Sequence, residues 1–277
     1  MNNIFNKIKK VFIGHYIKEK FNRLFDFLND RTITVKIDES KKIIFSDIGK
    51  ASGLRSRSIL YKEKSTIKWI DSFEENSLFF DIGASIGTFT LYSAIKKNCN
   101  VVSIEPSASN FAILNLNIYR NSLNHKVIAF PFVASYKNDL DFFYKTKVSM
   151  DESGGYPYKD IDPRGLKANS KFKQGVVCYK IDDLLKKFDY PDYIKIDVDG
   201  NELELIKGMD QILKSNKVKS IMIELNENIK HYDDVIKIME YNEFVLDKNL
   251  TSIADVSTKK DGRIYNHYFS KNHLVKL

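Results

Sequence analysis

The feature that most constrains the fold is a regular alternation of short apolar runs and helical stretches. The apolar runs cover residues 78–82, 101–105, 127–133, 193–197 and 219–225. The helical stretches that separate or follow them cover residues 88–97, 107–121, 181–188 and 202–214. Continuous apolar runs are typical of strands that are buried on both faces of a parallel sheet. The order therefore predicts an α/β fold, with a doubly wound, mostly parallel, Rossmann-like sheet.

The two ends of the chain depart from this alternation. Residues 243–247 and 263–270 are joined by a polar loop without a helix, and they predict a terminal antiparallel pair in the sheet. Near the other end, residues 32–37 and 42–47 flank a polar turn and predict a β-hairpin. A helix is expected near residues 58–73.

The first residues carry an amphipathic helical pattern. Apolar positions recur at a helical spacing through residues 3–29, with several lysines among them. Such a helix packs on the domain, or it lies on a membrane surface or a partner as a basic amphipathic helix. Its apolar runs are shorter than a membrane-spanning helix needs, and they do not indicate a signal peptide. We expect an N-terminal extension over residues 1–74 and one α/β domain over residues 75–277.

One internal segment breaks the pattern of strands and helices. Residues 147–174 contain two adjacent glycines, two prolines and little apolar periodicity. A long stretch of this kind inside a compact domain is usually functional or disordered. We expect a lid-like insertion. Its Tyr156, Tyr158, Lys159 and Arg164 either contact a substrate or stay in solvent.

The run LFFDIGASIGTFT, residues 78–90, carries the clearest ligand signal. Gly83 and Gly87 bracket a loop between a strand and a helix, where bare backbone can approach a ligand. Glu105 ends the next strand, 22 residues after Gly83, which suits a carboxylate that accepts hydrogen bonds from ribose hydroxyls. Asp81 would repel a pyrophosphate, but it would tolerate an ammonium group or indirectly help to hold one. The loop therefore favours S-adenosylmethionine over a nicotinamide dinucleotide.

Several blocks of the sequence resemble the FkbM-type methyltransferase family. They are FFDIGASIGTFT, IEPSASNFAILNLNIYRNSL, KIDDLL, YIKIDVDGNELELIKGM and IMIELNEN, spread over residues 75–227. Members of this family are class I enzymes that use S-adenosylmethionine, and most are O-methyltransferases. Ser85 stands where the family usually has Asn, and Asp199 stands where it usually has Glu.

The resemblance implies a class I methyltransferase domain over residues 75–277, with the cofactor at the ends of its strands. The residues expected to contact the cofactor are Asp81, Gly83, Ala84, Ser85, Gly87, Glu105, Pro106, Phe132 and Asp197. Phe132 and Val133 could supply an apolar wall for the adenine, or they could equally belong to the core.

Acidic residues gather at the ends of the fourth and fifth strands. Asp197 and Asp199 share one side of the fourth strand, and Glu224 and Asn226 share one side of the fifth. In one mechanism, Asp197, Asp199, Glu224 or His231 is the general base for a hydroxyl acceptor. In another, Asp197, Glu224 and Asn226 bind Mg²⁺ through oxygen atoms, as in metal-dependent catechol-type O-methyltransferases. In a third, the acids only cap the following helix.

The acceptor is less constrained than the cofactor. The formal net charge of +8 favours anionic partners without selecting one. Methylation of nucleic-acid bases is disfavoured, because DVDG replaces the expected Asn/Asp-Pro-Pro-aromatic run and Cys178 precedes the position of a cysteine nucleophile. The resemblance implies a hydroxyl acceptor, often a sugar or a polyketide-like molecule.

We expect O-methylation of a sugar, a nucleotide-sugar or a lipid-linked glycan during surface polysaccharide assembly. Two unpaired cysteines fit a reducing, cytoplasmic compartment, and residues 3–29 could contact the inner membrane face. The alternatives are a polyketide-like acceptor, a nicotinamide-dependent oxidoreductase, and a non-catalytic binding module on the same fold. The sequence indicates no particular oligomeric state.

Overall fold

The computed structural model describes residues 19–20, 31–48, 50–146, 155–157, 159–160, 167–228, 231–251 and 264–271. The predicted helix over residues 3–29 lies outside the described residues, apart from Glu19 and Lys20. Much of the insertion over residues 147–174, including Tyr158 and Arg164, also lies outside them. The description below concerns the α/β body of the chain.

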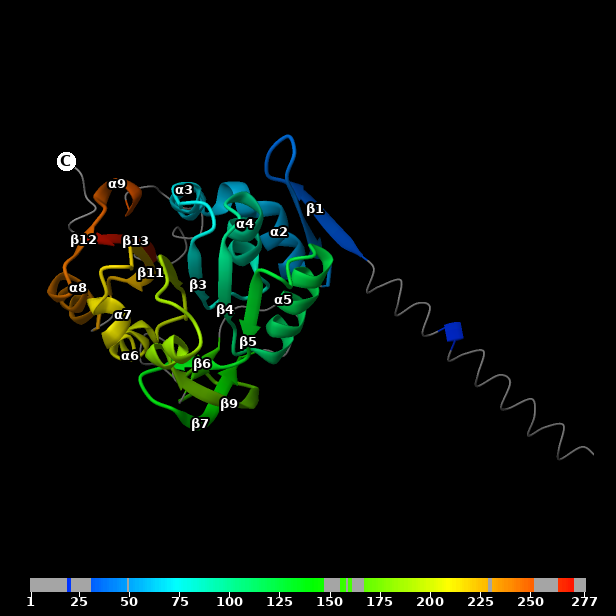
Figure 1. Cartoon of the computed structure of the whole chain (residues 1–277). Coiled ribbons are helices and arrows are strands. Elements are labelled where there is room, and N and C mark those ends of the chain that lie inside the picture. Colours follow the sequence, from blue (N-terminus) through cyan, green and yellow to red (C-terminus); the bar gives the residue numbers. More distant parts are fainter. Residues whose placement is uncertain are drawn as a thin grey trace, which may run out of the picture.

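A seven-stranded sheet forms the centre of the described fold (Figure 1). Its strands are β3 (Leu78–Ile82), β4 (Asn100–Ile104), β5 (Val127–Phe130), β10 (Tyr193–Ile196), β11 (Ser220–Asn226), β12 (Phe244–Leu246) and β13 (Ile264–Lys271). Their order is β12-β13-β11-β10-β3-β4-β5, and the five strands from β11 to β5 run parallel. β13 runs antiparallel to both β11 and β12. The predicted doubly wound sheet with a terminal antiparallel pair is confirmed.

Helices cover both faces of this sheet. They are α3 (Lys64–Asp71), α4 (Thr88–Lys96), α5 (Ala108–Arg120), α6 (Glu202–Lys207), α7 (Asp210–Lys214) and α8 (Tyr232–Tyr241). On one face, Phe80 and Ile194 pack with apolar residues of α6, α7 and α8. On the other face, Phe79 and Met222 pack with residues of α3, α4 and α5. Successive strand residues thus enter opposite cores, which explains the continuous apolar runs in the sequence.

Several predicted elements differ from the structure. The helix expected over residues 202–214 is divided into α6 and α7 at Gly208, where a Cβ would lie 2.1 Å from the Ser135 carbonyl oxygen. The run over residues 127–133 ends as β5 at Phe130. The loop after β12 contains a short helix, α9 (Lys248–Thr251), so the expectation of a loop without a helix is wrong.

The N-terminal hairpin packs directly on the central domain. Its strands are β1 (Thr32–Lys36) and β2 (Lys42–Ser46), and they are followed by α2 (Lys50–Lys62). Ile43 and Phe45 are buried in the same core as residues of α4 and α5. The Asn117 side-chain oxygen in α5 accepts bonds from the Ser46 amide and hydroxyl, both at 2.7 Å. The helix expected near residues 58–73 is two helices, α2 and α3. The boundary at residue 74 stays a prediction.

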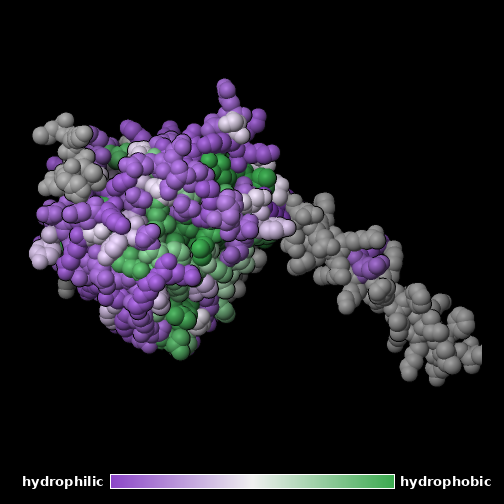
Figure 2. All heavy atoms as spheres, in the orientation of Figure 1, coloured by the Kyte–Doolittle hydropathy of each residue, from purple (hydrophilic) through white to green (hydrophobic). Residues whose placement is uncertain are grey.

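A second, small sheet was not predicted from the sequence. Its strands are β6 (Val133–Ser135), β7 (Asp139–Lys145), β8 (Tyr156–Pro157) and β9 (Phe172–Lys180), in the order β6-β9-β7-β8. Leu140 and Phe142 are exposed on its outer side, while Phe143 and Lys145 are buried on its inner side. In Figure 2, apolar atoms reach the lower edge of the molecule, where Figure 1 places β7 and β9. Because apolar side chains lie on the exposed side and a lysine lies on the buried side, the alternation did not indicate strands.

None of the described helices combines the length and the apolar character needed to cross a bilayer.

Candidate functional site

A pocket lies at the carboxyl ends of β3, β4 and β10. At this edge the chain order reverses, because β3 has β4 on one side and β10 on the other. Such a switch point is the usual ligand site of an open α/β sheet. The β3–α4 loop supplies Gly83, Ala84 and Ser85 to the pocket lining, and the end of β4 leads into Glu105 and Pro106. These five predicted cofactor residues therefore surround one space.

Gly83 is required by a close approach between two loops. Its φ is +82°, and a Cβ there would lie 1.8 Å from the Asp197 carbonyl oxygen. No side chain fits at that distance, and a positive φ itself favours glycine. The β3–α4 loop is thus held against the segment that carries the acids. Gly87 precedes α4 and does not line the pocket, and its expected contact with a cofactor stays a prediction.

Glu105 is a buried carboxylate on the pocket wall. Its Oε2 accepts a 2.8 Å bond from the Ser85 amide, and its Oε1 accepts a 2.8 Å bond from the Ser107 amide. Burial raises the pKa of Glu105 to about 7, although the two amide bonds act in the opposite direction. Each oxygen keeps a further lone pair that can accept a hydroxyl hydrogen. The group is therefore placed to bind a vicinal diol such as that of a ribose.

Asp81 lies behind the pocket lining and not at its surface. Its Oδ2 accepts a 2.5 Å bond from the Thr90 hydroxyl, and its Oδ1 lies 3.9 Å from the Lys195 ammonium. Burial raises the pKa of Asp81, while Lys195 opposes that shift. The ammonium beside Asp81 thus belongs to Lys195, and Asp81 does not line the pocket. Its expected role in holding the cofactor stays a prediction.

Lys195 is a central residue of the site that the sequence analysis missed. It lies in β10 with a side chain that is 1% exposed, and its Nζ is 2.9 Å from Asp197 Oδ2. Burial alone would lower the pKa of Lys195, but the carboxylates of Asp197, Asp81 and Glu63 outweigh burial and raise it. A lysine inside a buried strand is rare without a charged partner. The letters YIKI offered that signal.

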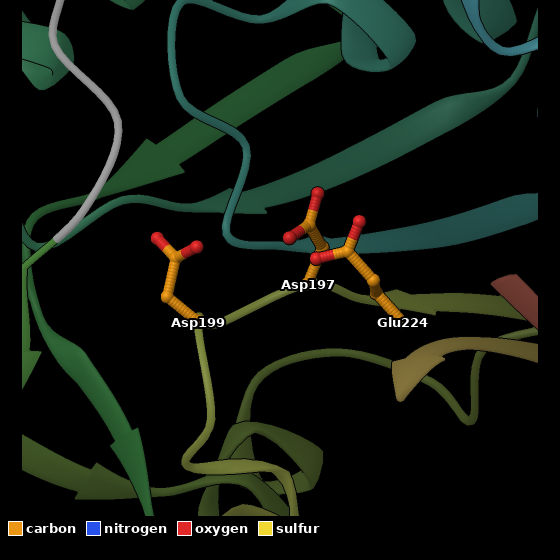
Figure 3. Close-up of side chains that lie close together, drawn as sticks. All are labelled: Asp197, Asp199 and Glu224. Atoms are coloured by element: carbon orange, nitrogen blue, oxygen red, sulfur yellow. The ribbon is translucent and has the colours of Figure 1, made fainter. Parts of the chain in front are cut away.

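Asp197, Asp199 and Glu224 form a cluster of three carboxylates (Figure 3). One carboxylate oxygen of each residue lies within 4.8 Å of those of the other two. The Asp197 charge, followed by burial, raises the pKa of Glu224 well above its ordinary value. A neighbouring negative charge disfavours the ionised form of a carboxyl group, so Glu224 keeps its proton to a higher pH than an isolated glutamate does. The cluster can accept a proton from a hydroxyl group.

The same three carboxylates fit a hard divalent cation. Mg²⁺ prefers oxygen ligands, and three convergent carboxylates provide them. The Lys195 ammonium competes for one oxygen of Asp197. Asn226 does not line the pocket, and its side-chain oxygen accepts a 2.9 Å bond from the Asn228 amide. The metal set expected from the sequence stays a prediction, and Asp199 is a further carboxylate beside Asp197 and Glu224.

Two further predicted residues do not reach the pocket. His231 is exposed just before α8, with its Nδ1 3.8 Å from Asp234 Oδ2. Phe132 belongs to the core under α6, and its ring packs on Tyr179. Val133 and Ala134 line the pocket in its place. The expectations of a histidine base and of a Phe132 wall are therefore corrected.

Two segments outside the resembling blocks complete the pocket lining. Ser58, Lys62 and Glu63, in α2 and directly after it, line the pocket near the acids. Gly155 and Pro157 line it from the predicted insertion. Sequence reasoning placed no function in residues 50–63, because their pattern indicates only a helix. The N-terminal region thus helps to build the site.

Glu202 binds the loop that carries Asp197 and Asp199, and the shifted pKa of its carboxyl group can be tested. It is 7% exposed in the first turn of α6, and its Oε1 accepts a 2.9 Å bond from the Gly200 amide. Burial raises the pKa of Glu202 to about 7 from 4.5. The folded state therefore binds a proton that the unfolded state releases, and this stabilisation is lost as the pH rises from 4.5 through 7.

We expect Glu202→Gln to gain stability relative to the wild type as the pH rises, because glutamine does not titrate. The difference in unfolding free energy between variant and wild type should increase by about 1–3 kcal/mol from pH 4.5 to pH 8. Urea unfolding at both pH values measures it. Glu204→Gln, at an exposed position of α6, should give the same difference at both. A Glu202→Gln difference that does not change with pH contradicts the assignment.

The sequence of the chain is similar to sequences of known methyltransferases. Residues 81–246, more than half of the chain, match the family described as "Methyltransferase FkbM domain". The hexuronic acid methyltransferase AglP of Haloferax volcanii is 26% identical over 179 residues, which cover 61% of this chain and 64% of AglP. The methyltransferase sdnD of Sordaria araneosa is 25% identical over 206 residues, which cover 65% of this chain and 78% of sdnD. The match thus spans slightly less than two thirds of the Haloferax protein.

Among solved structures, the methyltransferase FkbM of Methylobacillus flagellatus aligns with a TM-score of 0.49 at 19% identity. The alignment covers 71% of this chain and 44% of that structure.

Proposed function

Because the chain belongs to the family of methyltransferase FkbM domains, we propose that it methylates a hydroxyl group with S-adenosylmethionine as the methyl donor. The observation that carries the proposal is the position of Glu105 and the Asp197–Glu224 pair on one pocket. Glu105 would bind the ribose of the donor, and the two acids that line the same pocket would take the proton of the acceptor. Donor binding and proton removal are the two tasks that O-methylation requires.

The residues of the pocket suggest how the donor would lie. Glu105 would bind the ribose hydroxyls, and the apolar side chains of Val133 and Ala134 would face the adenine. The backbone of Gly83, Ala84 and Ser85 would approach the amino-acid part. Asp197, next to Gly83, would then adjoin the methyl-bearing end. When bound, S-adenosylmethionine supplies a methyl group on a positively charged sulfur, which an oxygen nucleophile can displace.

The acidic pair would remove the acceptor proton. A hydroxyl group has a pKa far above 7, so its oxygen becomes a good nucleophile only as the proton leaves. The proton would pass to the Asp197–Glu224 pair while the oxygen forms its bond to the methyl carbon. Lys195 holds Asp197 through a 2.9 Å contact and so fixes the direction of its carboxylate. Alignment of this kind contributes much of the rate of a displacement reaction.

Metal assistance is the second route to the same reaction. Asp197, Asp199 and Glu224 would hold Mg²⁺, which when bound lowers the pKa of a hydroxyl that it contacts. The base route has the firmer support, because the Lys195 ammonium already neutralises part of the cluster. Removal of divalent ions distinguishes the two routes and is part of the first experiment in the Discussion.

A sugar or glycan is the acceptor class with the most support. Ser58, Lys62, Glu63 and Asn201 line the pocket and can pair with several hydroxyl groups. The Haloferax relative is named for a hexuronic acid, a sugar that carries a carboxylate. Lys62 offers a cation for such a group. We propose nucleotide-sugars and lipid-linked glycans as the first acceptors to test, with polyketide-like phenols as the comparison.

The first test measures donor binding. Titration calorimetry should show micromolar binding of S-adenosylhomocysteine and no binding of NAD. Glu105→Ala should weaken the binding by about 1–3 kcal/mol, the range for hydrogen bonds to a charged group. Glu204→Ala, at an exposed position of α6, is the matched control and should leave the affinity unchanged. Binding of NAD in place of S-adenosylhomocysteine would support the oxidoreductase alternative, and binding of neither would support a non-catalytic module.

A further inference from the structure

The small sheet of β6, β7, β8 and β9 makes a set of contacts that the proposed reaction does not use. Its inner side faces the segment over residues 105–109, which follows β4 and leads into α5. Two side chains of the inner side, Lys145 in β7 and Gln174 in β9, reach this segment. Both are polar residues at positions where a sheet normally carries apolar ones. Their presence there calls for a physical reason.

Gln174 binds the backbone of the segment from both ends of its amide. Its Nε2 donates a 2.7 Å bond to the Pro106 carbonyl oxygen, and its Oε1 accepts a 3.1 Å bond from the Ala108 amide. The two bonds fix the path of the chain on either side of Ser107. They involve neutral groups only. Gln174 therefore fixes the position of this segment without adding a charge to it.

Lys145 binds the side chains of the same segment. It is 4% exposed, and its Nζ donates a 2.8 Å bond to the Ser107 hydroxyl and a 3.2 Å bond to the Ser109 hydroxyl. The Ser107 amide in turn donates to Glu105 Oε1 at 2.8 Å. The chain of contacts from Lys145 to Glu105 thus passes through one residue.

The charges around Glu105 make the Lys145 ammonium significant. Within the described chain, two charged side chains act on Glu105: Asp199, after β10, disfavours its ionised form, and Lys145 favours it. The amides of Ser107 and Ser85 also favour the ionised form. Loss of Lys145 would remove a favourable charge and the bond to the hydroxyl of Ser107, whose amide binds Glu105. Both changes act in the same direction.

We infer that the small sheet clamps the segment over residues 105–109, and that Lys145 is a positioning residue that aims Glu105 at the ribose of the donor through Ser107 and places a positive charge near it. Gln174 positions the same segment without acting on its charge. The inference rests on the proposed function, since it assumes that Glu105 binds a ribose. It assigns a role in donor binding to a sheet that lies outside the Rossmann-like core.

The test is the affinity for S-adenosylhomocysteine at pH 7 and pH 9, measured by calorimetry on the full chain. Ionised Glu105 is the binding form, so a variant that raises the pKa of Glu105 loses more affinity at pH 7 than at pH 9. We expect the loss caused by Lys145→Met to be about threefold larger at pH 7 than at pH 9, since a nearby opposite charge lowers the pKa of a carboxyl group. Gln174→Leu is the matched control and should cause the same loss at both pH values.

Two further variants show the path of the effect. Lys145→Arg retains the charge and should restore the wild-type pH dependence. In a Glu105→Gln background, Lys145→Met should cause a loss that no longer depends on pH. If Lys145→Met does not fold, judged by its melting curve, Lys145→Gln replaces it with the same expectation.

The outcomes separate this inference from the proposed function. Equal losses for Lys145→Met at both pH values overturn the inference, as does a pH-dependent loss that persists in the Glu105→Gln background. If the wild type does not bind S-adenosylhomocysteine at either pH, the proposed function itself fails. Wild-type binding that rises with pH, with the Lys145→Met pattern above, supports both.

Discussion

Asp197→Asn should lower kcat for methyl transfer by about 10²- to 10⁴-fold, the usual contribution of a general base. Asparagine retains the shape of aspartate and an oxygen for the Lys195 ammonium, but it cannot take the acceptor proton. KM for the donor should change much less than kcat, because Glu105 binds the donor at the other end of the pocket. Initial rates with a radiolabelled methyl donor and the acceptor found by screening measure both constants.

Matched variants and a chelator identify the role of the carboxylates. Glu224→Gln should cause a loss of kcat similar to that of Asp197→Asn, because both carboxylates belong to the cluster that would take the acceptor proton. Glu204→Gln, at an exposed position of α6, should leave kcat unchanged. Excess EDTA should also leave the wild-type rate unchanged. A rate that EDTA abolishes and Mg²⁺ restores would replace the base route with the metal route, and a normal rate for Asp197→Asn would exclude both.

Lys195→Met should lower the free energy of unfolding by about 3–5 kcal/mol, the usual result of removing one partner of a buried ion pair. Methionine fills a similar volume, so the loss would come from the charges that remain. Asp81 is 1% exposed and would lose the one cation near its Oδ1 among the described residues. Chemical unfolding followed by circular dichroism at pH 7.5 measures the loss.

The control for Lys195→Met is Lys219→Met. The Lys219 ammonium also contacts two carboxylates, those of Glu74 and Asp192, but its side chain is 26% exposed, against 1% for Lys195. Surface pairs contribute little, so Lys219→Met should cost less than about 1 kcal/mol. Asp81→Asn in the Lys195→Met background should recover part of the stability by removing the uncompensated charge. A Lys195→Met loss no greater than that of Lys219→Met would contradict the buried-pair interpretation.

The central sheet could be predicted because its strands are buried on both faces. Phe79 and Phe80 are adjacent in the chain and enter opposite cores, so their run is apolar without interruption. The helix over residues 202–214 was predicted as continuous because Gly208 is tolerated inside a helical pattern. The structure needs a glycine at position 208 because the Ser135 carbonyl of the small sheet approaches it closely. This is a tertiary contact, which no local sequence pattern contains.

The small sheet was missed for the opposite reason. Leu140 and Phe142 face solvent, while Lys145 and Gln174 are turned inward to the segment over residues 105–109. A prediction from alternation assigns apolar residues to the inside, and here the inner side is partly polar because it binds a loop. The departure from the rule coincides with the site, as is common where function and folding compete.

The sequence predicted many of the residues in the site, but it did not predict the contacts between them. Glu105, the acids after β10 and Glu224 near the end of β11 could be predicted from where the strands end. Lys195 was not found, because a lysine in a strand is commonly a surface residue. The position of Asp81 behind the pocket depends on that lysine. Residues 58–63 reach the pocket only through the folding of α2 on the domain.

The place of β13 in the sheet has a consequence for the synthesis of this protein. β13 lies between β11 and β12, although it follows both of them in the chain. Its Tyr268 hydroxyl also bonds Ser65 in α3 at 2.7 Å. A ribosome delivers the chain from its N-terminus, so β11 keeps an open edge until residue 271 has emerged. An open apolar edge is a template for strands of other chains. The sheet therefore closes only after β13 has been synthesised, and until then the edge of β11 is open to strands of other chains.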